Sequence, residues 1–188
     1  RPLAPADPRA GGRSDPAPVA ARVHELWQTA DRADAAQQFG VELQLLRELA
    51  RLQPNDLRVY SRLGLICVSL QDRPGAGGAF KRAAEIAPKD PGIATNYGSA
   101  LVQAGMLDEA DRYLAPWAPS IGECPELGLL LGKVCALKKR RAEAIRHLRA
   151  ALGARKQVTP ELVFDVATVL RDVGEVPEAE AAFRRCAA

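Results

Sequence analysis

The sequence has few of the residues from which metal, haem and catalytic cofactor sites are built. Its 188 residues include two histidines, four cysteines and 5% aromatic residues. The cysteines form no CxxC pair, and neither histidine stands at zinc-ligand spacing from a cysteine, so we expect no metal site and no cofactor. The motifs GxSxG, HExxH, the Walker loop and the dinucleotide fingerprint are also missing. The sequence therefore predicts no enzyme within these residues.

A strong charge of one sign and a long apolar run are missing too. The 26 Lys and Arg residues against 23 Asp and Glu residues leave a net charge of +3, which argues against a specific nucleic-acid binder. No stretch approaches 18 uncharged apolar residues, so we expect no membrane span. The chain begins with Arg1 rather than Met, and we expect it to be a processed product or part of a longer protein. Cytoplasmic and periplasmic locations both stay open.

Residues 1–18 differ in composition from the remainder of the chain. They contain five prolines and two glycines and show no apolar periodicity. Such a segment buries too little apolar surface to offset the entropy of ordering, so we expect a flexible tail or linker. In residues 19–188 apolar side chains recur every three and four positions, which predicts a single helical domain.

A period of 34 residues runs through this helical part. A proline begins each of three predicted helices, at spacings of 34 and 35 residues: Pro91, Pro125 and Pro160. The predicted N-cap residues Asp90 and Thr159 precede the first and the third of these prolines. Small residues form one column: Gly64, Gly98, Gly132 and Ala167. Large apolar residues form another column: Phe80, Leu114, Leu148 and Phe183. We expect the small residues to let two helices approach closely and the large ones to fill the space between them.

This pattern resembles the tetratricopeptide repeat, a unit of two antiparallel helices. The resemblance implies an all-α superhelical solenoid in which neighbouring units share one core. It covers four good repeats, at residues 57–90, 91–124, 125–159 and 160–188. A degenerate N-terminal repeat precedes them at residues 23–56, and in it Glu42 occupies the small-residue column. Arginine far outnumbers lysine, a bias typical of GC-rich bacterial genomes.

By the same resemblance, the first helix of each unit lines a concave face that binds a protein or peptide. The candidate partner-binding residues on this face are Trp27, Arg58, Ser61, Leu65, Ser69, Thr95, Asn96, Ser99, Gln103, Leu129, Lys133, Phe164 and Thr168. Further positions on it are Asp31, Val68, Val102, Ala136 and Arg171. The mixture of polar middle and apolar ends suits an extended segment or an amphipathic helix. Only Asn96 matches the carboxylate clamp of the chaperone-binding relatives, so that function is not expected.

The sequence thus predicts a non-catalytic scaffold or adaptor that binds a protein or peptide. In bacteria, the resemblance implies roles in envelope assembly, secretion or signalling complexes. One alternative is a repeat domain of a larger enzyme, such as a transferase, that positions a substrate protein or mediates oligomerisation. Another is a homo-oligomeric repeat protein.

One proline and three cysteines lead to further local predictions. Pro116 falls where the second helix of a unit should continue, so that helix should end near Ala115. Cys67 and Cys135 lie in apolar runs and should be buried thiols, whereas Cys124 should lie in a loop and react faster.

Two further groups are expected to face solvent. His147 lies between arginines on a predicted helix. The basic run 138–141 falls in a turn between helices, where charged residues are usually solvated. It could instead attract an acidic partner, an anionic lipid or a nucleic acid.

Overall fold

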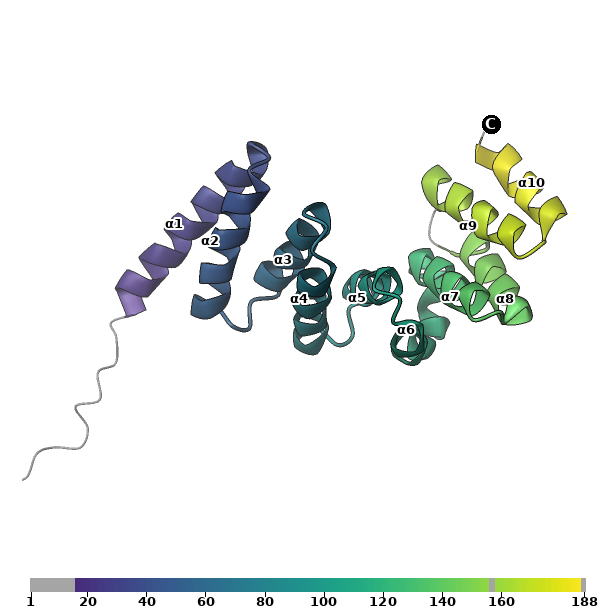
Figure 1. Ribbon diagram of the computed structural model, residues 1–188, viewed down its shortest axis with the longest axis horizontal. Coiled ribbons are helices and arrows are strands. Elements are labelled where there is room, and N and C mark those ends of the chain that lie inside the picture. The colour runs from purple at the N-terminus through teal and green to yellow at the C-terminus, as the bar shows by residue number, and fades with distance from the viewer. Residues whose placement is uncertain (1–15, 156–157, 187–188) are drawn as a thin grey trace, which may run out of the picture. The chain divides into compact units, whose positions relative to one another are not determined.

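The computed structural model describes residues 16–155 and 158–186, and within these residues the secondary structure is entirely helical (Figure 1). The chain divides into two compact units, Arg1–Pro54 and Asn55–Ala188. Each unit is built from helices that pack in pairs, as the two-helix repeat predicts.

The first unit consists of α1 (Pro16–Ala35) and α2 (Phe39–Leu52). Its core includes Leu26, Ala30, Leu46 and Leu49, all at most 1% exposed. Glu42, the residue that departs from the small-residue column, lies fully buried on α2. Helix α1 begins at Pro16, within the segment expected to be a tail, and residues 1–15 lie outside the described part of the chain.

The second unit contains four helix pairs, with a 3₁₀ segment in the second pair. Their bounds are α3 Leu57–Ser69, α4 Arg73–Ile86, α5 Pro91–Gln103, α6 Leu107–Leu114, η1 Ala115–Gly122, α7 Pro125–Leu137, α8 Arg141–Leu152, α9 Pro160–Asp172 and α10 Val176–Cys186. Figure 1 shows α7 packed beside α8 and α9 beside α10. The expected all-α arrangement of antiparallel helix pairs is confirmed.

Helix starts follow the predicted capping chemistry. Each of α5, α7 and α9 begins with the proline of the 34-residue period. The carboxylate of Asp90 accepts hydrogen bonds from the N–H groups of Gly92 at 2.8 Å and Ile93 at 3.1 Å. The hydroxyl of Thr159 accepts from Leu162 N–H at 3.3 Å. These bonds satisfy amides that have no partner inside their helices.

The small-residue and large-residue columns meet inside the helix pairs. A Cβ atom added at the glycine would lie within 2.6 Å of the large side chain in each of three pairs: Gly64–Phe80, Gly98–Leu114 and Gly132–Leu148. No real Cβ contact is that short, so the large side chain occupies the space that the missing Cβ leaves. The close approach inferred from the sequence is therefore confirmed.

The turn between the two helices of a pair has a recurrent backbone geometry. One residue per turn takes a left-handed conformation with a positive φ. These residues are Gln37 (53°), Gln71 (58°), Gly105 (75°), Lys139 (59°) and Gly174 (87°). In each turn the next N–H donates to the carbonyl five residues earlier; the bond from Arg140 N to Cys135 O, for example, is 2.8 Å long. This is the Schellman geometry, which closes the first helix and satisfies its last carbonyls.

Two local departures from the repeat have different outcomes. Helix α6 ends at Leu114 and continues as the 3₁₀ segment η1, which confirms the break expected from Pro116. The first turns of α4 contain Gly75, Gly77 and Gly78, which disfavour a helix, yet α4 forms a continuous helix of 14 residues. The side chain of Asp72 caps it by accepting from Gly75 N–H at 3.0 Å.

Candidate functional site

The first helices of the last three pairs, α5, α7 and α9, line an open cavity of about 420 Å³ that we call the aliphatic pocket. Its lining residues are Val102, Lys133, Ala136, Leu137, Thr168, Val169, Asp172 and Val173. Five of these are aliphatic, and Leu137 is 58% exposed, so the pocket presents apolar surface that water can reach. Such a lining suits an apolar side chain of a ligand.

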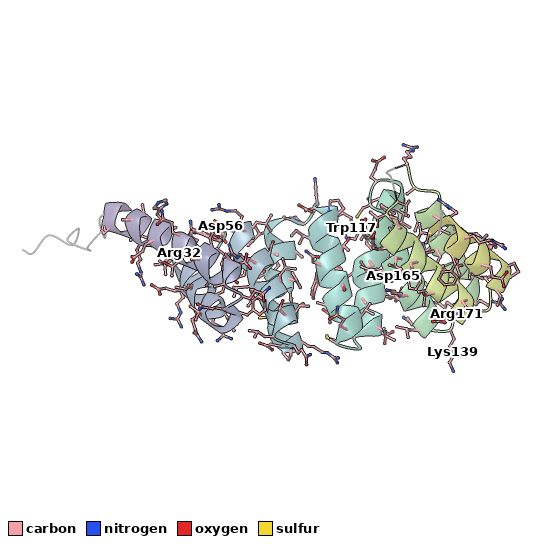
Figure 2. The ribbon with its side chains drawn as sticks, turned by 90° about the horizontal axis from the view of Figure 1, so that it is seen from above. Arg32, Asp56, Trp117, Lys139, Asp165 and Arg171 are labelled. Atoms are coloured by element: carbon pink, nitrogen blue, oxygen red, sulfur yellow. The ribbon has the colours of Figure 1, made fainter. Side chains whose placement is uncertain are left out.

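The two charged residues that line the aliphatic pocket, Lys133 and Asp172, both form ion pairs. The ammonium group of Lys133 is 3.8 Å from the carboxylate of Asp165. The carboxylate of Asp172 accepts from Arg171 at 3.3 Å. Figure 2 shows Asp165 and Arg171 on α9. All four side chains of these two ion pairs are exposed or half-buried, so each pair contributes little to stability. A ligand can therefore replace one partner of a pair at a small cost in free energy.

A second cavity, of about 400 Å³, lies among α3, the start of α4 and α5, and we call it the Arg73 pocket. Its lining residues are Val68, Gln71, Arg73, Ala76, Ala100 and Gln103. Its polar groups are two amides and one guanidinium, which can donate hydrogen bonds to a ligand oxygen.

The structure brings part of the sequence-predicted set into these two cavities. Lys133 and Thr168, together with Val102 and Ala136 of the wider face, line the aliphatic pocket. Gln103 lines the Arg73 pocket. The remaining predicted residues lie outside both cavities: Trp27, Arg58, Ser61, Leu65, Ser69, Thr95, Asn96, Ser99, Leu129 and Phe164.

Several predicted polar residues are engaged with their own helices. The hydroxyls of Ser69, Thr95 and Thr168 donate to backbone carbonyls one turn earlier, at 3.2, 2.8 and 3.0 Å. Arg58 forms an ion pair with Asp56 at 3.0 Å and, mainly through the hydrogen bond between the two side chains, lowers the pKa of that carboxyl group. The hydroxyl oxygens of these two threonines and of Ser69 keep their acceptor lone pairs. Toward a ligand, these three groups therefore act chiefly as hydrogen-bond acceptors.

The three large apolar residues of the predicted set differ in accessibility. Phe164 is 55% exposed, with its ring edge-on to Phe183 and the two centroids 5.3 Å apart. Leu129, at the equivalent position one unit earlier, is only 7% exposed and offers a partner almost no side-chain surface. Trp27, in the first unit, is half-buried and donates its indole N–H to Gln53 at 3.2 Å.

The basic run 138–141 is not the solvated turn that the sequence indicated. Lys138 contacts the carboxylates of Asp108 at 2.8 Å and Asp111 at 2.7 Å, and Arg140 contacts Asp111 at 2.6 Å. Arg141 forms an ion pair with Glu175 at 3.0 Å. The expectation was wrong because the acidic partners come from the neighbouring helix pairs, which only stacking brings within reach.

Lys139 is exposed and, unlike the other three members of this run, forms no ion pair within the described residues. Figure 2 shows its side chain pointing outward from the α7–α8 turn. With its neighbours neutralised by carboxylates, the turn has little net positive charge. An electrostatic attachment of an anionic partner to the run is therefore disfavoured.

Burial also changes the expected chemistry of the cysteines and of His147. Cys67 and Cys135 are buried as expected, but Cys124 is only 8% exposed and is the N-cap residue of α7 rather than part of an open loop. Desolvation raises the pKa of the thiols of Cys124 and Cys135. His147 is half-buried rather than solvent-facing, and this burial lowers its pKa.

Residues 16–155 and 158–186 contain no group of three or more His, Cys, Asp or Glu side chains that could hold a metal ion. The same part of the chain includes no helix that is both long and apolar enough to cross a membrane. These residues do form the aliphatic pocket and the Arg73 pocket.

Sequence reasoning missed several lining residues. Leu137 and Val173 lie in or just after the last turn of a first helix, beyond the positions that the repeat pattern assigns to the inner face. Arg73 begins a second helix, which the repeat pattern does not assign to the inner face. Its position directly after the turn of the unit is the signal that could have identified it.

Comparison with solved structures finds the same helical-repeat fold in MamA proteins. A MamA structure from Desulfovibrio magneticus RS-1 is 15% identical, with a TM-score of 0.71, and the match covers 88% of this chain and 93% of that one. MamA of AMB-1 is 22% identical, with a TM-score of 0.63 and coverage of 88% and 90%. MamA of MSR-1 is 21% identical, with a TM-score of 0.62 and coverage of 88% and 94%. The chain thus has the all-α fold of a tetratricopeptide-repeat solenoid.

No protein-family model and no curated protein matches the sequence. The likeness to MamA is a likeness of fold, because all of these identities lie below 25%. What the chain binds has to be argued from its own surface.

Proposed function

We propose that this chain is a non-catalytic adaptor that binds a peptide segment of another protein across the first helices α5, α7 and α9. The observation that supports the proposal is the aliphatic pocket, an open cavity of about 420 Å³ between those helices. Its size and its aliphatic lining suit one apolar side chain of a ligand together with the adjacent backbone.

The exposure of the lining residues supports the same interpretation. Leu137 is 58% exposed, although an aliphatic side chain gains about 25 cal/mol for each Å² that is removed from water. A peptide that covers Leu137 and Val173 therefore gains binding energy from surface that the free protein leaves wet. The resemblance to bacterial repeat proteins suggests envelope assembly, secretion or signalling as the setting.

Selection from a displayed library of linear peptides tests this proposal. We expect peptides with an aliphatic anchor to be selected, and Leu137→Ser to weaken their binding by about tenfold or more, since a central anchor is worth about 2 kcal/mol or more. The matched control is Val176→Ser, because Val176 is 47% exposed and lines neither cavity. It should leave the affinity unchanged.

The readout is the dissociation constant of one selected peptide, measured by fluorescence anisotropy for the parent and both variants. Circular dichroism melts confirm that the variants are folded. If no peptide is selected, or if Leu137→Ser and Val176→Ser have equal effects, the groove does not bind peptides and the proposal is wrong.

A further inference from the structure

Both cavities border the last turn of α5. Val102 lines the aliphatic pocket and Gln103, the next residue of α5, lines the Arg73 pocket. Their Cα atoms are separated by about 3.8 Å, the distance across one peptide bond. A ligand that crosses the last turn of α5 therefore reaches both cavities.

The side chain of Arg73 is an exposed cation that makes no ion pair or side-chain hydrogen bond within the described part of the chain. Several other exposed or half-buried basic side chains of this unit are paired, as in Arg82–Glu85 at 2.8 Å and Arg141–Glu175 at 3.0 Å. The guanidinium group of Arg73 is thus available to a ligand.

Two acidic groups near Arg73 are engaged elsewhere. The carboxylate of Asp72, its neighbour in sequence, caps α4 by accepting from Gly75 N–H at 3.0 Å. Glu109 lines the adjoining cavity that Arg73 also borders, and it accepts from the hydroxyl of Tyr97 at 3.0 Å. An external carboxylate would complete the charge balance at Arg73.

The surroundings of Arg73 favour a carboxylate as its ligand. A guanidinium group binds a carboxylate through two parallel N–H···O bonds, which is the strongest arrangement available to it. The amides of Gln71 and Gln103 line the same cavity and can donate to the remaining oxygen lone pairs. Gln103 is held in place by its own hydrogen bond to Ser99 at 3.2 Å.

We infer that the peptide bound by this protein carries an acidic side chain for Arg73 and an aliphatic side chain for the aliphatic pocket. This inference rests on the proposed function and adds the chemistry of the partner to it. Neighbouring packed helices lie about 8–10 Å apart, and an extended chain advances about 3.3 Å per residue. The two side chains are therefore about three residues apart in the sequence of the partner.

The same displayed library, applied to the parent and to Arg73→Glu, tests the inference. We expect the parent to select peptides with Asp or Glu about three residues from Leu, Ile or Val. Arg73→Glu should lose the acidic preference, gain a preference for Lys or Arg, and keep the aliphatic anchor. The control is Arg184→Glu, which changes an exposed arginine of α10 outside both cavities and should keep the parent's preference.

One synthetic peptide from the parental selection then gives the magnitude. We expect its affinity to fall by about tenfold or more with Arg73→Glu, because a charge-assisted hydrogen bond is lost and replaced by repulsion. Arg184→Glu should change the affinity less than about twofold, as expected for an exposed charge far from the ligand.

The two failures are distinguishable. Peptides that need Leu137 but carry no acidic residue, or that bind Arg73→Glu as well as the parent, would overturn the inference and leave the proposed function standing. Peptides that ignore Leu137, or a failure to select any, would remove both.

Discussion

A Cβ atom on Gly132 would lie 2.5 Å from Cδ2 of Leu148, a side chain that is fully buried between α7 and α8. The absence of a side chain at Gly132 and the size of Leu148 are therefore two halves of one contact. This contact recurs one period earlier between Gly98 and Leu114.

Replacing Gly132 by Leu should destabilise the protein by about 1–3 kcal/mol, because the added atoms overpack a contact that has no free volume. The matched control is Gly78→Leu on α4, where an added Cβ meets no atom within 4 Å. There the gain in helix propensity, up to about 1 kcal/mol, should dominate. Urea unfolding of both variants measures the difference, and equal midpoints would show that the two columns do not pack as described.

The left-handed turn residues give a second prediction. At Lys139, where φ is 59°, a side chain is strained by about 1–2 kcal/mol, whereas glycine is not. The greater freedom of glycine in the unfolded chain offsets about 0.5–1 kcal/mol of this gain. Lys139→Gly should therefore stabilise the protein by about 0.5–1 kcal/mol.

The reverse substitution at the equivalent turn should have the opposite sign. Gly105 has φ of 75° and an added Cβ meets no atom within 4 Å, so Gly105→Ala introduces strain without a clash. It should destabilise by about 1 kcal/mol. Thermal melts read out both variants, and a stabilised Gly105→Ala would contradict the assigned turn geometry.

The carboxylate of Asp111 supports a pH-dependent prediction. Partial burial alone would raise the pKa of Asp111, but the hydrogen bonds from Lys138 and Arg140 outweigh it and lower this pKa. A lowered pKa in the folded state means that the carboxylate adds stability above about pH 4, which is lost as the pH falls through the folded-state value. Asp111→Asn should therefore cost roughly 1 kcal/mol at pH 7.

Urea unfolding at several pH values measures this effect. The difference in unfolding free energy between the parent and Asp111→Asn should shrink as the pH falls below about 4 and the carboxyl group becomes protonated. Asp165→Asn is the control, since Asp165 is exposed and lies 3.8 Å from Lys133, and it should cost less than about 0.5 kcal/mol. A difference that stays constant down to about pH 2.5 would contradict the charge-based explanation.

The four cysteines should differ in their reaction with a thiol reagent in the native state. Cys67, Cys124 and Cys135 are 3%, 8% and 2% exposed, so they should react slowly. Cys186 is half-buried near the end of α10 and should react first. Mass spectrometry of labelled peptides identifies the order, and rapid labelling of Cys124 would restore the loop position that its sequence context suggested.

The candidate site could be predicted only in outline. The helical period selected Lys133 and Thr168, which occupy equivalent positions one period apart, and both line the aliphatic pocket. It could not distinguish Leu129, which is buried, from Phe164, which is exposed, although the two occupy equivalent positions in their repeats. Their exposure depends on the packing of neighbouring units, which differs along the stack.

The sequence by itself determined the elements and their pairing. Prolines and cap residues such as Asp90 fix where helices begin, and a glycine opposite a large residue fixes how closely two helices approach; both are properties of residues close together in the chain. Only the tertiary structure decided which charges are neutralised and which cavities open. Lys138 contacts Asp108 and Asp111, which lie about 30 residues earlier in the chain, whereas the guanidinium group of Arg73 stays free. Both outcomes depend on distances between stacked helix pairs, which a local sequence pattern does not determine.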